Sequence, residues 1–462
     1  MSKVEKVAVI GLDCFEPSLV FDRWRDKLPV MSELMEQGIY GELESTIPAI
    51  TVPAWMSMMT SRNPGVMGFY GFRNRKDYSY DEMFFANANA VQVPTVWKLL
   101  SRKRKKVILL SIPQTYPPKP VNGCLVGCFL TPDTNVDFTY PAELKQELWD
   151  KVGEYIIDVK DFRTENKDFL IEQIYQMTAR RFETAEYLIR NKAWDFFMMV
   201  EMGPDRFHHG MWKYHDDKHI GYVPNSPYKD SIRDYYIYLD GKIGALLKSI
   251  DRLNTAVLIV SDHGAKRMEG GFCLNDWLIQ QGYLTLKEPI NKPKMLKNSD
   301  IDFTRTKVWG SGGYYGRLFI NVAGREPAGV IPESEYEAFR TELKERLEGV
   351  LDHRGQLMGN KAFRPEEIYI EVKGVAPDLI VYFGDLAWRS VGTVGNDTWY
   401  VFENDTGPDD ANHSQYGMYI FSLPGVRIGR NQPQRIMDIA PTILDLLEVE
   451  VPPEMEGERI RF

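Results

Sequence analysis

The sequence has few cysteines, no long apolar run and no excess of positive charge. No apolar run reaches the length of a membrane span, so no membrane partner is expected. The formal net charge is −9, from 56 Lys and Arg against 65 Asp and Glu, which argues against a nucleic-acid polymer as the main partner. The cysteines contain no Cys-x-x-Cys pair and suggest no disulfide framework; they are Cys14, Cys124, Cys128 and Cys273.

The start and composition of the chain favour a soluble cytoplasmic protein. A predicted strand follows Met1 almost directly, which leaves no room for a signal peptide. The length of 462 residues allows a large core with an inserted module. The negative charge stays compatible with a small anionic substrate, because bound metal ions would invert the local field.

Apolar runs alternate with helix-like segments through the first half of the chain. The runs are short and rich in branched residues, as in strands buried on both faces of a sheet; they cover residues 7–12, 107–112, 196–200 and 256–260. Segments with helical spacing lie at 30–37, 96–103, 166–191 and 230–250. This alternation predicts an α/β fold whose mostly parallel central sheet carries helices on both faces.

The pattern changes after Gly264, and residues 265–375 are predicted to form an inserted α/β subdomain that caps the sheet. It would contain a Gly-rich segment at 310–313, strands at 317–322 and 368–372, and a helix at 334–351. The core, residues 1–264 and 376–462, would resume with a strand at 377–383 and close with a helix at 438–447. Aromatic residues in this region could stack on a leaving group or form the insertion's own core; they are Phe272, Trp309, Tyr314 and Tyr315.

Carboxylates follow three of the predicted strands where each strand ends. Asp13 comes directly after the first run, Asp205 shortly after the run at 196–200, and Asp262 with His263 after the run at 256–260. In an open parallel sheet, ligands bind beyond the carboxyl ends of the strands. Carboxylates and imidazoles that gather there can hold divalent cations, so this edge is the predicted functional site.

Asp205 and His209 are four residues apart after a proline, which places both side chains on one face of a predicted helix. They could share a metal ion; the alternative is an Asp that caps the helix and a surface His. The neighbouring His208 could be the ligand instead, although the spacing favours His209 and leaves His208 to a supporting position. His215 and His219 repeat the spacing, but their charged surroundings predict that both are exposed.

The Asp262-His263-Gly264 sequence is a sharper signal, because a turn at glycine lets two consecutive side chains converge on one cation. The alternative is a buried Asp that caps the turn. Asp13 alone is weaker, since an Asp after a first strand also caps helices or binds ribose. His413 lies in a loop rich in Gly, Asp and Asn, and offers one more imidazole.

A hydroxyl stands at the predicted start of another helix. Pro53 suits the first turn of a helix that runs through Trp55, so Thr51 would lie at its N-terminus. Exposed N–H groups and the helix dipole attract anions there. Thr51 could simply be the N-cap, or, beside a pair of metal ions, it could lose its proton and act as a nucleophile.

In their order along the chain, these motifs resemble the alkaline phosphatase superfamily, and within it the type I phosphodiesterase/nucleotide pyrophosphatase branch. The C-terminal segment Asp438-Ile439-Ala440-Pro441-Thr442 also resembles the closing helix of that superfamily. The resemblance spans nearly the whole chain. Its motifs are Asp13, Thr51 in Thr-Val-Pro, Asp205 with His209, Ser261-Asp262-His263-Gly264, and His413.

The resemblance implies two metal positions and a nucleophile. Asp205, His209 and His413 would bind one metal. Asp13, Asp262 and His263 would bind the other, which Thr51 would also contact before it attacks phosphorus. Mixed oxygen and nitrogen ligands suit Zn²⁺ or Mn²⁺ better than Ca²⁺. Two ions roughly 4 Å apart can stabilise the attacking and leaving oxygens of an in-line displacement, which would pass through a phospho-threonine.

One position departs from the branch that the motifs resemble. Its members generally carry an Asn three residues after the nucleophile, whereas this chain has Ala54. Another group must then meet the transition-state charge: Arg62, Arg206, Lys266 or a backbone amide at the helix start. The departure puts nucleotide substrates in question. The sulfatase branch fits less well, since its Cys or Ser followed by Pro and Arg is missing around Thr51.

The sequence therefore predicts a two-metal hydrolase of small phosphate esters, more suited to diesters or pyrophosphates than to monoesters. A phosphomonoesterase or phosphomutase of the same superfamily is the first alternative. A non-catalytic protein that binds phosphate anions is the second. The sequence leaves the oligomeric state open.

Overall fold

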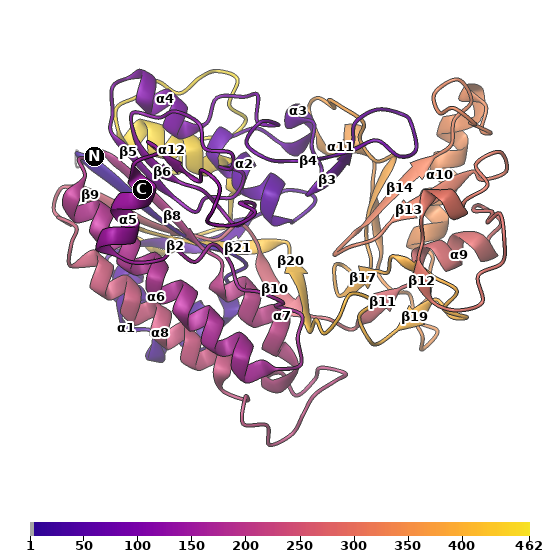
Figure 1. Ribbon diagram of the computed structural model, residues 1–462, viewed down its shortest axis with the longest axis horizontal. Coiled ribbons are helices and arrows are strands. Elements are labelled where there is room, and N and C mark those ends of the chain that lie inside the picture. Colours follow the sequence, from indigo (N-terminus) through magenta and orange to yellow (C-terminus); the bar gives the residue numbers. More distant parts are fainter. Residues whose placement is uncertain (1–3) are drawn as a thin grey trace.

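The computed structural model describes residues 4–462, and its larger part is built on a ten-stranded sheet (Figure 1). β1 is parallel to its neighbours β8 and β9, and β5 is parallel to β8 and β6. β21 is antiparallel to β9 and β2, and β7 is antiparallel to β6. The predicted mostly parallel sheet is confirmed, and its antiparallel pairs make it a mixed sheet. Its strands, in spatial order, are β22 (Gly429–Arg430), β2 (Gly38–Glu44), β21 (Tyr416–Ser422), β9 (Thr255–Val260), β1 (Lys6–Leu12), β8 (Phe196–Glu201), β5 (Val107–Leu110), β6 (Gly123–Val126) and β7 (Thr139–Tyr140), with β23 (Gln434–Arg435) also on β2.

Helices cover both faces of this sheet (Figure 1). Because strand side chains alternate, Ala8 and Ile10 of β1 belong to one apolar core, and Val7 and Val9 to the other. Five helices lie on the first core: α1 (Pro29–Glu36), α5 (Leu144–Lys151), α6 (Lys167–Asn191), α7 (Gly203–His215) and α8 (Ser231–Leu247). Three lie on the second: α2 (Thr51–Thr60), α4 (Val96–Arg102) and α12 (Ile439–Leu446). Within residues 4–462, no helix combines the length and apolarity needed to cross a bilayer.

A second, smaller part has its own sheet and apolar core (Figure 1). Its antiparallel sheet has the order β13 (Val308–Ser311), β14 (Gly316–Ile320), β16 (Leu379–Tyr382) and β15 (Lys361–Phe363). Two helices accompany it, α9 (Leu274–Gln280) and α10 (Tyr336–Glu348).

The remaining elements of the described chain are short. The small sheets are β10 (Gly264–Arg267) with β20 (Ala411–Ser414); β17 (Trp388–Ser390), β11 (Gly270–Phe272) and β19 (Tyr400–Val401); β12 (Lys294–Met295) with β18 (Thr393–Val394); and β3 (Arg73–Arg75) with β4 (Met83–Phe85). The remaining helical turns are α3 (Pro64–Met67), α11 (Pro365–Ile368), a π-helical turn at Leu19–Arg23, and 3₁₀ turns at Arg25–Lys27, Asn298–Asp300, Glu333–Glu335 and Ile436–Asp438.

Two predictions in this region are wrong: the sheet that one strand joins, and the existence of a second strand. The run at 377–383 was expected to rejoin the central sheet, but β16 pairs with β14 and β15 in the smaller one. A buried apolar run looks the same in either sheet, because its pairing partner is set by tertiary packing. Residues 368–372 form no strand: Ile368 ends the short helix α11, and Ile370 beyond it is 72% exposed. The division at residues 265 and 375 as a whole stays a prediction.

Candidate metal centre

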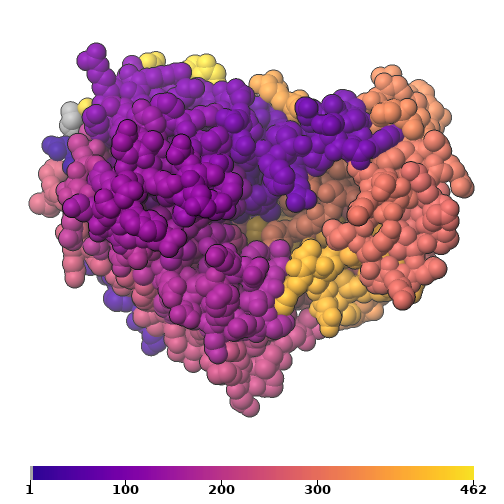
Figure 2. Space-filling model, in the orientation of Figure 1, coloured from indigo at the N-terminus to yellow at the C-terminus, as the bar shows by residue number. Residues whose placement is uncertain are grey.

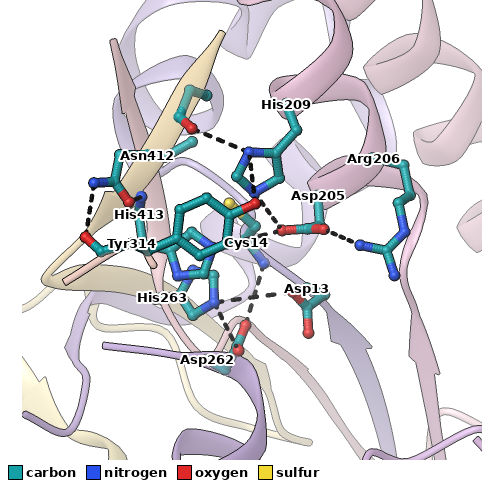
Figure 3. Close-up of polar contacts among 12 residues, drawn as sticks. Asp13, Cys14, Asp205, Arg206, His209, Asp262, His263, Tyr314, Asn412 and His413 are labelled. Atoms are coloured by element: carbon teal, nitrogen blue, oxygen red, sulfur yellow. Dashed lines mark hydrogen bonds and ion pairs between the residues drawn. The ribbon is translucent and has the colours of Figure 1, made fainter. Parts of the chain in front are cut away.

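The carboxyl ends of three neighbouring strands meet at one edge of the large sheet. Asp13 follows β1, Asp205 lies in the first turn of α7 just after β8, and Asp262 follows β9. The parallel register aligns these ends, since Leu12 pairs with Glu201 and Gly11 with Val260. The structure thus gathers the predicted strand-end carboxylates in one place (Figure 3).

The first group of candidate ligands is Asp205, His209 and His413. The Nε2 atoms of His209 and His413 lie 3.2 and 3.9 Å from Oδ1 of Asp205. The first pair is one turn apart on α7, as the spacing predicts. His413 arrives from β20, which pairs with β10 so that His413 stands opposite Ala265. All three side chains are buried.

The second group is Asp13, Asp262 and His263, whose side chains are fully buried. Nε2 of His263 lies 3.1 Å from Oδ2 of Asp262 and 4.0 Å from Oδ1 of Asp13. The rings of His263 and His413 stack with their centroids 3.8 Å apart, which places the two groups side by side. The structure therefore brings together all six residues that the sequence proposed as ligands.

Several atoms of these groups lack a protein partner. Among residues 4–462, no hydrogen bond reaches Oδ1 of Asp13, Oδ2 of Asp262, or Nε2 of His263 and His413. A buried polar atom without a partner is costly, and native proteins keep few of them. Divalent cations would satisfy all four atoms, and mixed carboxylate and imidazole donors are the ligands that such ions take. The donor set fits two metal ions.

Burial shifts the pKa values of the carboxyl groups and of the imidazoles at this site in opposite directions. It raises the pKa of Asp13, which the neighbouring Asp205 charge raises further, and that of Asp262, which the Asp13 charge also raises. Burial lowers the pKa of His263 well below its usual range and that of His413 to about 4. The two imidazoles are therefore neutral, which is the form that binds metal, whereas the carboxyl groups would release protons as a cation binds.

His209 is held by a carboxylate that the sequence analysis missed. Its Nδ1 lies 2.7 Å from Oδ1 of Asp409 and 3.0 Å from the Ala411 carbonyl. Burial alone would lower the pKa of His209, but Asp409 and Asp205 raise it to about 10. A carboxylate on one ring nitrogen directs the other nitrogen at the metal position. The acidic loop just before His413 was the available signal for Asp409.

Cys14 is a second residue near the candidate ligands that the sequence analysis did not predict. Its sulfur lies within 4.8 Å of ligand atoms of His263 and His413, and its N–H donates to Oδ1 of Asp262 at 3.2 Å (Figure 3). Its φ of 59° is the left-handed conformation that few non-glycine residues adopt. The only available signal was its place directly after Asp13.

Thr51 is the first residue of α2, and the start of this helix is tied to both groups. The carbonyl of Ala49 accepts a hydrogen bond from Nδ1 of His413 at 2.9 Å. Nε1 of Trp55 donates to Oδ2 of Asp13 at 2.7 Å. Trp55 follows Thr51 by four residues, so the two side chains share a helix face. Thr51 thus lies in the chain between Ala49, which contacts the first candidate metal group, and Trp55, which contacts the second.

Of the three cationic residues predicted to bind substrate, only Arg206 reaches the ligands. Its Nη1 donates to Asp205 at 2.6 Å, while Nε and Nη2 bond Asp158 at 3.1 and 2.6 Å. Arg62 lies beyond the far end of α2, a helix about 15 Å long at 1.5 Å per residue, and pairs with Glu456. Lys266 donates to the carbonyl of residue 385 at 2.7 Å. The structure does not bring Arg62 and Lys266 to the two groups.

The other histidines of α7 and the segment after it are not exposed. His208 is fully buried, lies 2.9 Å from the Tyr236 hydroxyl, and belongs to neither ligand group. The expectation that His215 and His219 are exposed is wrong. His215 is half-buried against two tryptophan rings, and Nε2 of His219 meets the Asp410 carbonyl at 2.9 Å. The charged residues around both histidines had suggested exposure to solvent, but the loop before β20 covers His219.

The aromatic residues around the Gly-rich segment divide between two roles. The ring of Tyr314 lies 4.8 Å from that of His209 and 4.5 Å from that of His413, and its hydroxyl donates to Asp409 at 3.1 Å. Tyr314 therefore covers the imidazoles of the first group. Phe272 and Trp309 belong to the core of the smaller sheet, as the second interpretation proposed.

Comparisons with known proteins identify a family and a similar fold. The family model described as type I phosphodiesterase/nucleotide pyrophosphatase matches residues 7–409. The fold is similar to human ectonucleotide pyrophosphatase/phosphodiesterase 5, with a TM-score of 0.57, 12% identity, and coverage of 98% of this chain and 97% of that one. The murine protein gives 0.55 and 13%, with coverage of 97% and 96%. An inactive murine variant in complex with AMP gives 0.55 and 12% at the same coverage. No curated protein sequence matches the chain.

Proposed function

This chain belongs to the type I phosphodiesterase/nucleotide pyrophosphatase family, whose members hydrolyse phosphoric ester bonds, and from that premise we propose a specific reaction for it. It hydrolyses small phosphoric diesters or pyrophosphates, with Thr51 as nucleophile and two divalent ions as cofactors. The observation that carries this proposal is the pair of buried ligand groups with unpaired atoms, whose members His413 and Asp13 hydrogen-bond residues at the start of α2.

Zn²⁺ and Mn²⁺ are the proposed ions, because they accept mixed oxygen and nitrogen donors. Their contribution when bound is Lewis-acid stabilisation of the phosphoryl oxygens and a lower pKa for the hydroxyl of Thr51. Asp205, His209 and His413 would hold one ion. Asp13, Asp262, His263 and the oxygen of Thr51 would hold the other.

In the reaction, Oγ1 of Thr51 attacks phosphorus and the ester oxygen of the leaving group departs. The leaving group takes up the proton that Thr51 loses. The resulting phospho-threonine keeps the second ester group, and water hydrolyses its bond to Oγ1, which restores the hydroxyl and releases a phosphomonoester. Trp55 keeps Asp13 in position through its indole N–H, and Asp409 does the same for His209. These two contacts preorganise the groups around the phosphate.

Backbone amides replace the missing side-chain amide at Ala54 in this proposal. Pro53 has no N–H, and the N–H of Ala54 is used by the carbonyl of Ile50 at 3.1 Å. The N–H groups of Thr51 and Val52 are then the ones left at the start of α2 to meet the transition-state charge.

Thr51→Ala tests the nucleophile. We expect a loss of about 10³-fold or more in kcat on bis(4-nitrophenyl) phosphate, since removal of a nucleophile leaves only binding and electrostatic catalysis. Metal content, measured by mass spectrometry, should stay near that of the unaltered protein. Thr51→Ser serves as the control because it keeps a hydroxyl. An unchanged rate in Thr51→Ala would refute the assignment.

A comparison of two substrates with the unaltered protein distinguishes the proposed diesterase function from the alternative phosphomonoesterase or phosphomutase function. A cavity of about 550 Å³ lined by Ile50 and Tyr314 leaves room for a second ester group, which supports the diesterase. We expect a higher kcat/KM on the bis(4-nitrophenyl) diester than on 4-nitrophenyl phosphate. The reverse order would favour the monoesterase.

A further inference from the structure

The cavity beside the metal centre has an unusual charge for this protein. It lies between the core and the smaller sheet, where the molecular surface is hollowed (Figure 2), and encloses about 550 Å³. Asp405 is the one acidic residue among its lining residues, whereas the chain as a whole carries a net charge of −9. The basic residues of the lining are Arg73, Arg75, Arg163, Arg317 and Arg389.

This cavity opens onto the proposed reaction site. Ile50 lines it and directly precedes Thr51. Tyr314 lines it too, and its ring packs on His209 and His413. A substrate whose phosphorus lies at Thr51 would therefore extend its ester group into the cavity.

Three of the five arginines are neutralised by carboxylates. Arg75 lies 3.3 Å from Glu326, with both side chains buried. Arg163 lies 3.1 Å from Asp409, and Arg389 lies 3.2 Å from Asp405. These pairs hold the cavity wall in place, and each of the three guanidinium groups already has a carboxylate partner.

Arg73 and Arg317 have no carboxylate partner in the described part of the chain, residues 4–462. Nη2 of Arg317 donates to Oγ of Ser311 at 2.8 Å, and Nη1 donates to the backbone carbonyl of Arg73. The guanidinium of Arg73 lies over the ring of Phe85, 5.0 Å from its centroid, and the residue is exposed. Their partners are neutral, so two full positive charges face the cavity.

All of these contacts also join strands. Arg317 bonds its cross-strand partner Ser311 and the carbonyl of Arg73 on β3. Arg73 lies over its own cross-strand partner, Phe85. None of the contacts supplies a negative charge, and each guanidinium has five N–H donors, so donors remain for an anion. Guanidinium groups form their strongest hydrogen bonds with carboxylates and phosphates, often through two donors at once.

We propose that Arg73 and Arg317 bind a second anionic group of the substrate, a phosphate or a carboxylate on the ester portion that occupies the cavity. This inference rests on the proposed function and narrows it to esters whose non-reacting end is negatively charged. The rings of Phe72, Trp309 and Phe319 line the same cavity and would pack against the carbon part of that ester group.

Binding by the metal-loaded Thr51→Ala protein tests this site without turnover. Three 4-nitrophenyl diesters serve as probes, with methyl, 2-carboxyethyl or 2-phosphonoethyl as the second ester group. We expect one or both charged diesters to bind about tenfold or more tightly than the methyl diester, measured by titration calorimetry. The stronger of the two charged ligands identifies carboxylate or phosphate as the anion.

Arg73→Gln and Arg317→Gln should each remove most of this preference and leave the affinity for the methyl diester within about twofold. Arg430→Gln is the matched control, because Arg430 is exposed and pairs with Asp22 outside the cavity. Arg73→Gln keeps the backbone carbonyl that Arg317 uses, so it tests charge recognition even if Arg317→Gln fails to fold.

Equal affinities for the three diesters, or a preference that survives in the Arg73→Gln and Arg317→Gln double variant, would overturn the proposal. These outcomes are separate from failure of the proposed function. If Thr51→Ala retained full turnover, the nucleophile assignment would fall. The charge preference would then be measured with metal-loaded protein and kcat/KM for the same diesters.

Discussion

At the scale of single residues, the carboxylate of Asp409 determines how a metal ligand is presented. It is fully buried, and burial alone would raise its pKa, yet His209 and nearby arginines lower the pKa to about 2. Asp409 is thus charged across the physiological range. A charged partner on Nδ1 of His209 keeps Nε2 free to face Asp205 and the metal position.

Asp409→Asn should weaken metal binding about 10- to 100-fold, because supporting carboxylates have effects of this size on metal affinity. Competition with a chromophoric chelator would measure the affinity for Zn²⁺. Activity should recover when excess metal is added, which a merely misfolded variant would not show. Asp385→Asn is the control, since Asp385 is exposed and pairs with Lys266 and Lys361. Unchanged affinity in Asp409→Asn would rule out the positioning role.

At the scale of elements, helix α2 packs closely against strand β1 at Gly11, which has no side chain. A Cβ atom at Gly11 would lie 2.5 Å from Cη2 of Trp55, closer than real contacts allow. The missing side chain lets the indole lie against β1 and donate to Asp13, two residues further on. The packing of one helix on one strand thereby sets the position of a candidate ligand and of Thr51.

Gly11→Ala should lower the free energy of unfolding by about 1–3 kcal/mol, since the extra methyl overpacks the contact with Trp55. Activity should fall with it, because the indole N–H would move away from Asp13. Urea denaturation and kcat on the diester would measure the two effects. Gly241→Ala is a matched control in α8, where an added Cβ meets nothing within 4 Å. We expect it to raise stability by about 0.5–1 kcal/mol; no difference between the variants would contradict the packing argument.

At the scale of the whole molecule, the metal centre couples the large sheet to the segment that returns after the smaller one. The two ligand groups lie at one edge of the large sheet, and their members come from positions as far apart as 13, just after β1, and 413, in β20. Ions bound there would add further connections between chain segments that strand pairing already joins. Ligands that bind only the folded state stabilise it in proportion to their occupancy.

Metal removal should therefore lower the Tm, and the difference should shrink as the pH falls. Asp13 and Asp262 have raised pKa values, so in the metal-free protein they keep protons above the usual value of 3.8. Such groups destabilise the metal-free fold as the pH rises through that range, and protons compete with metal as the pH falls. His413, with a pKa of about 4, stays neutral above that value. At 100 times the Kd, metal should add about 2.7 kcal/mol.

Thermal unfolding with saturating Zn²⁺ or with a chelator, across a series of pH values, would measure this difference. The Asp13→Asn and Asp262→Asn double variant should show a smaller metal-dependent shift and a weaker pH dependence. A shift that does not vary with pH would contradict competition at these two carboxyl groups.

Local patterns determined much of this protein. The spacing of Asp205 and His209, the strand ends at Asp13 and Asp262, and the helix start at Thr51 follow from helical and strand geometry, which neighbouring residues set. The same patterns predicted a mostly parallel sheet with helices on both faces, and the structure confirms it.

The tertiary structure alone decided the rest. The run at 379–382 joins the smaller sheet, His219 is covered, and Arg317 meets the backbone of Arg73 across 244 residues. Asp409 and Cys14 reach the imidazoles in the same way. Hydrophobic periodicity says which side of an element is buried, but the partner it is buried against depends on how the whole chain packs.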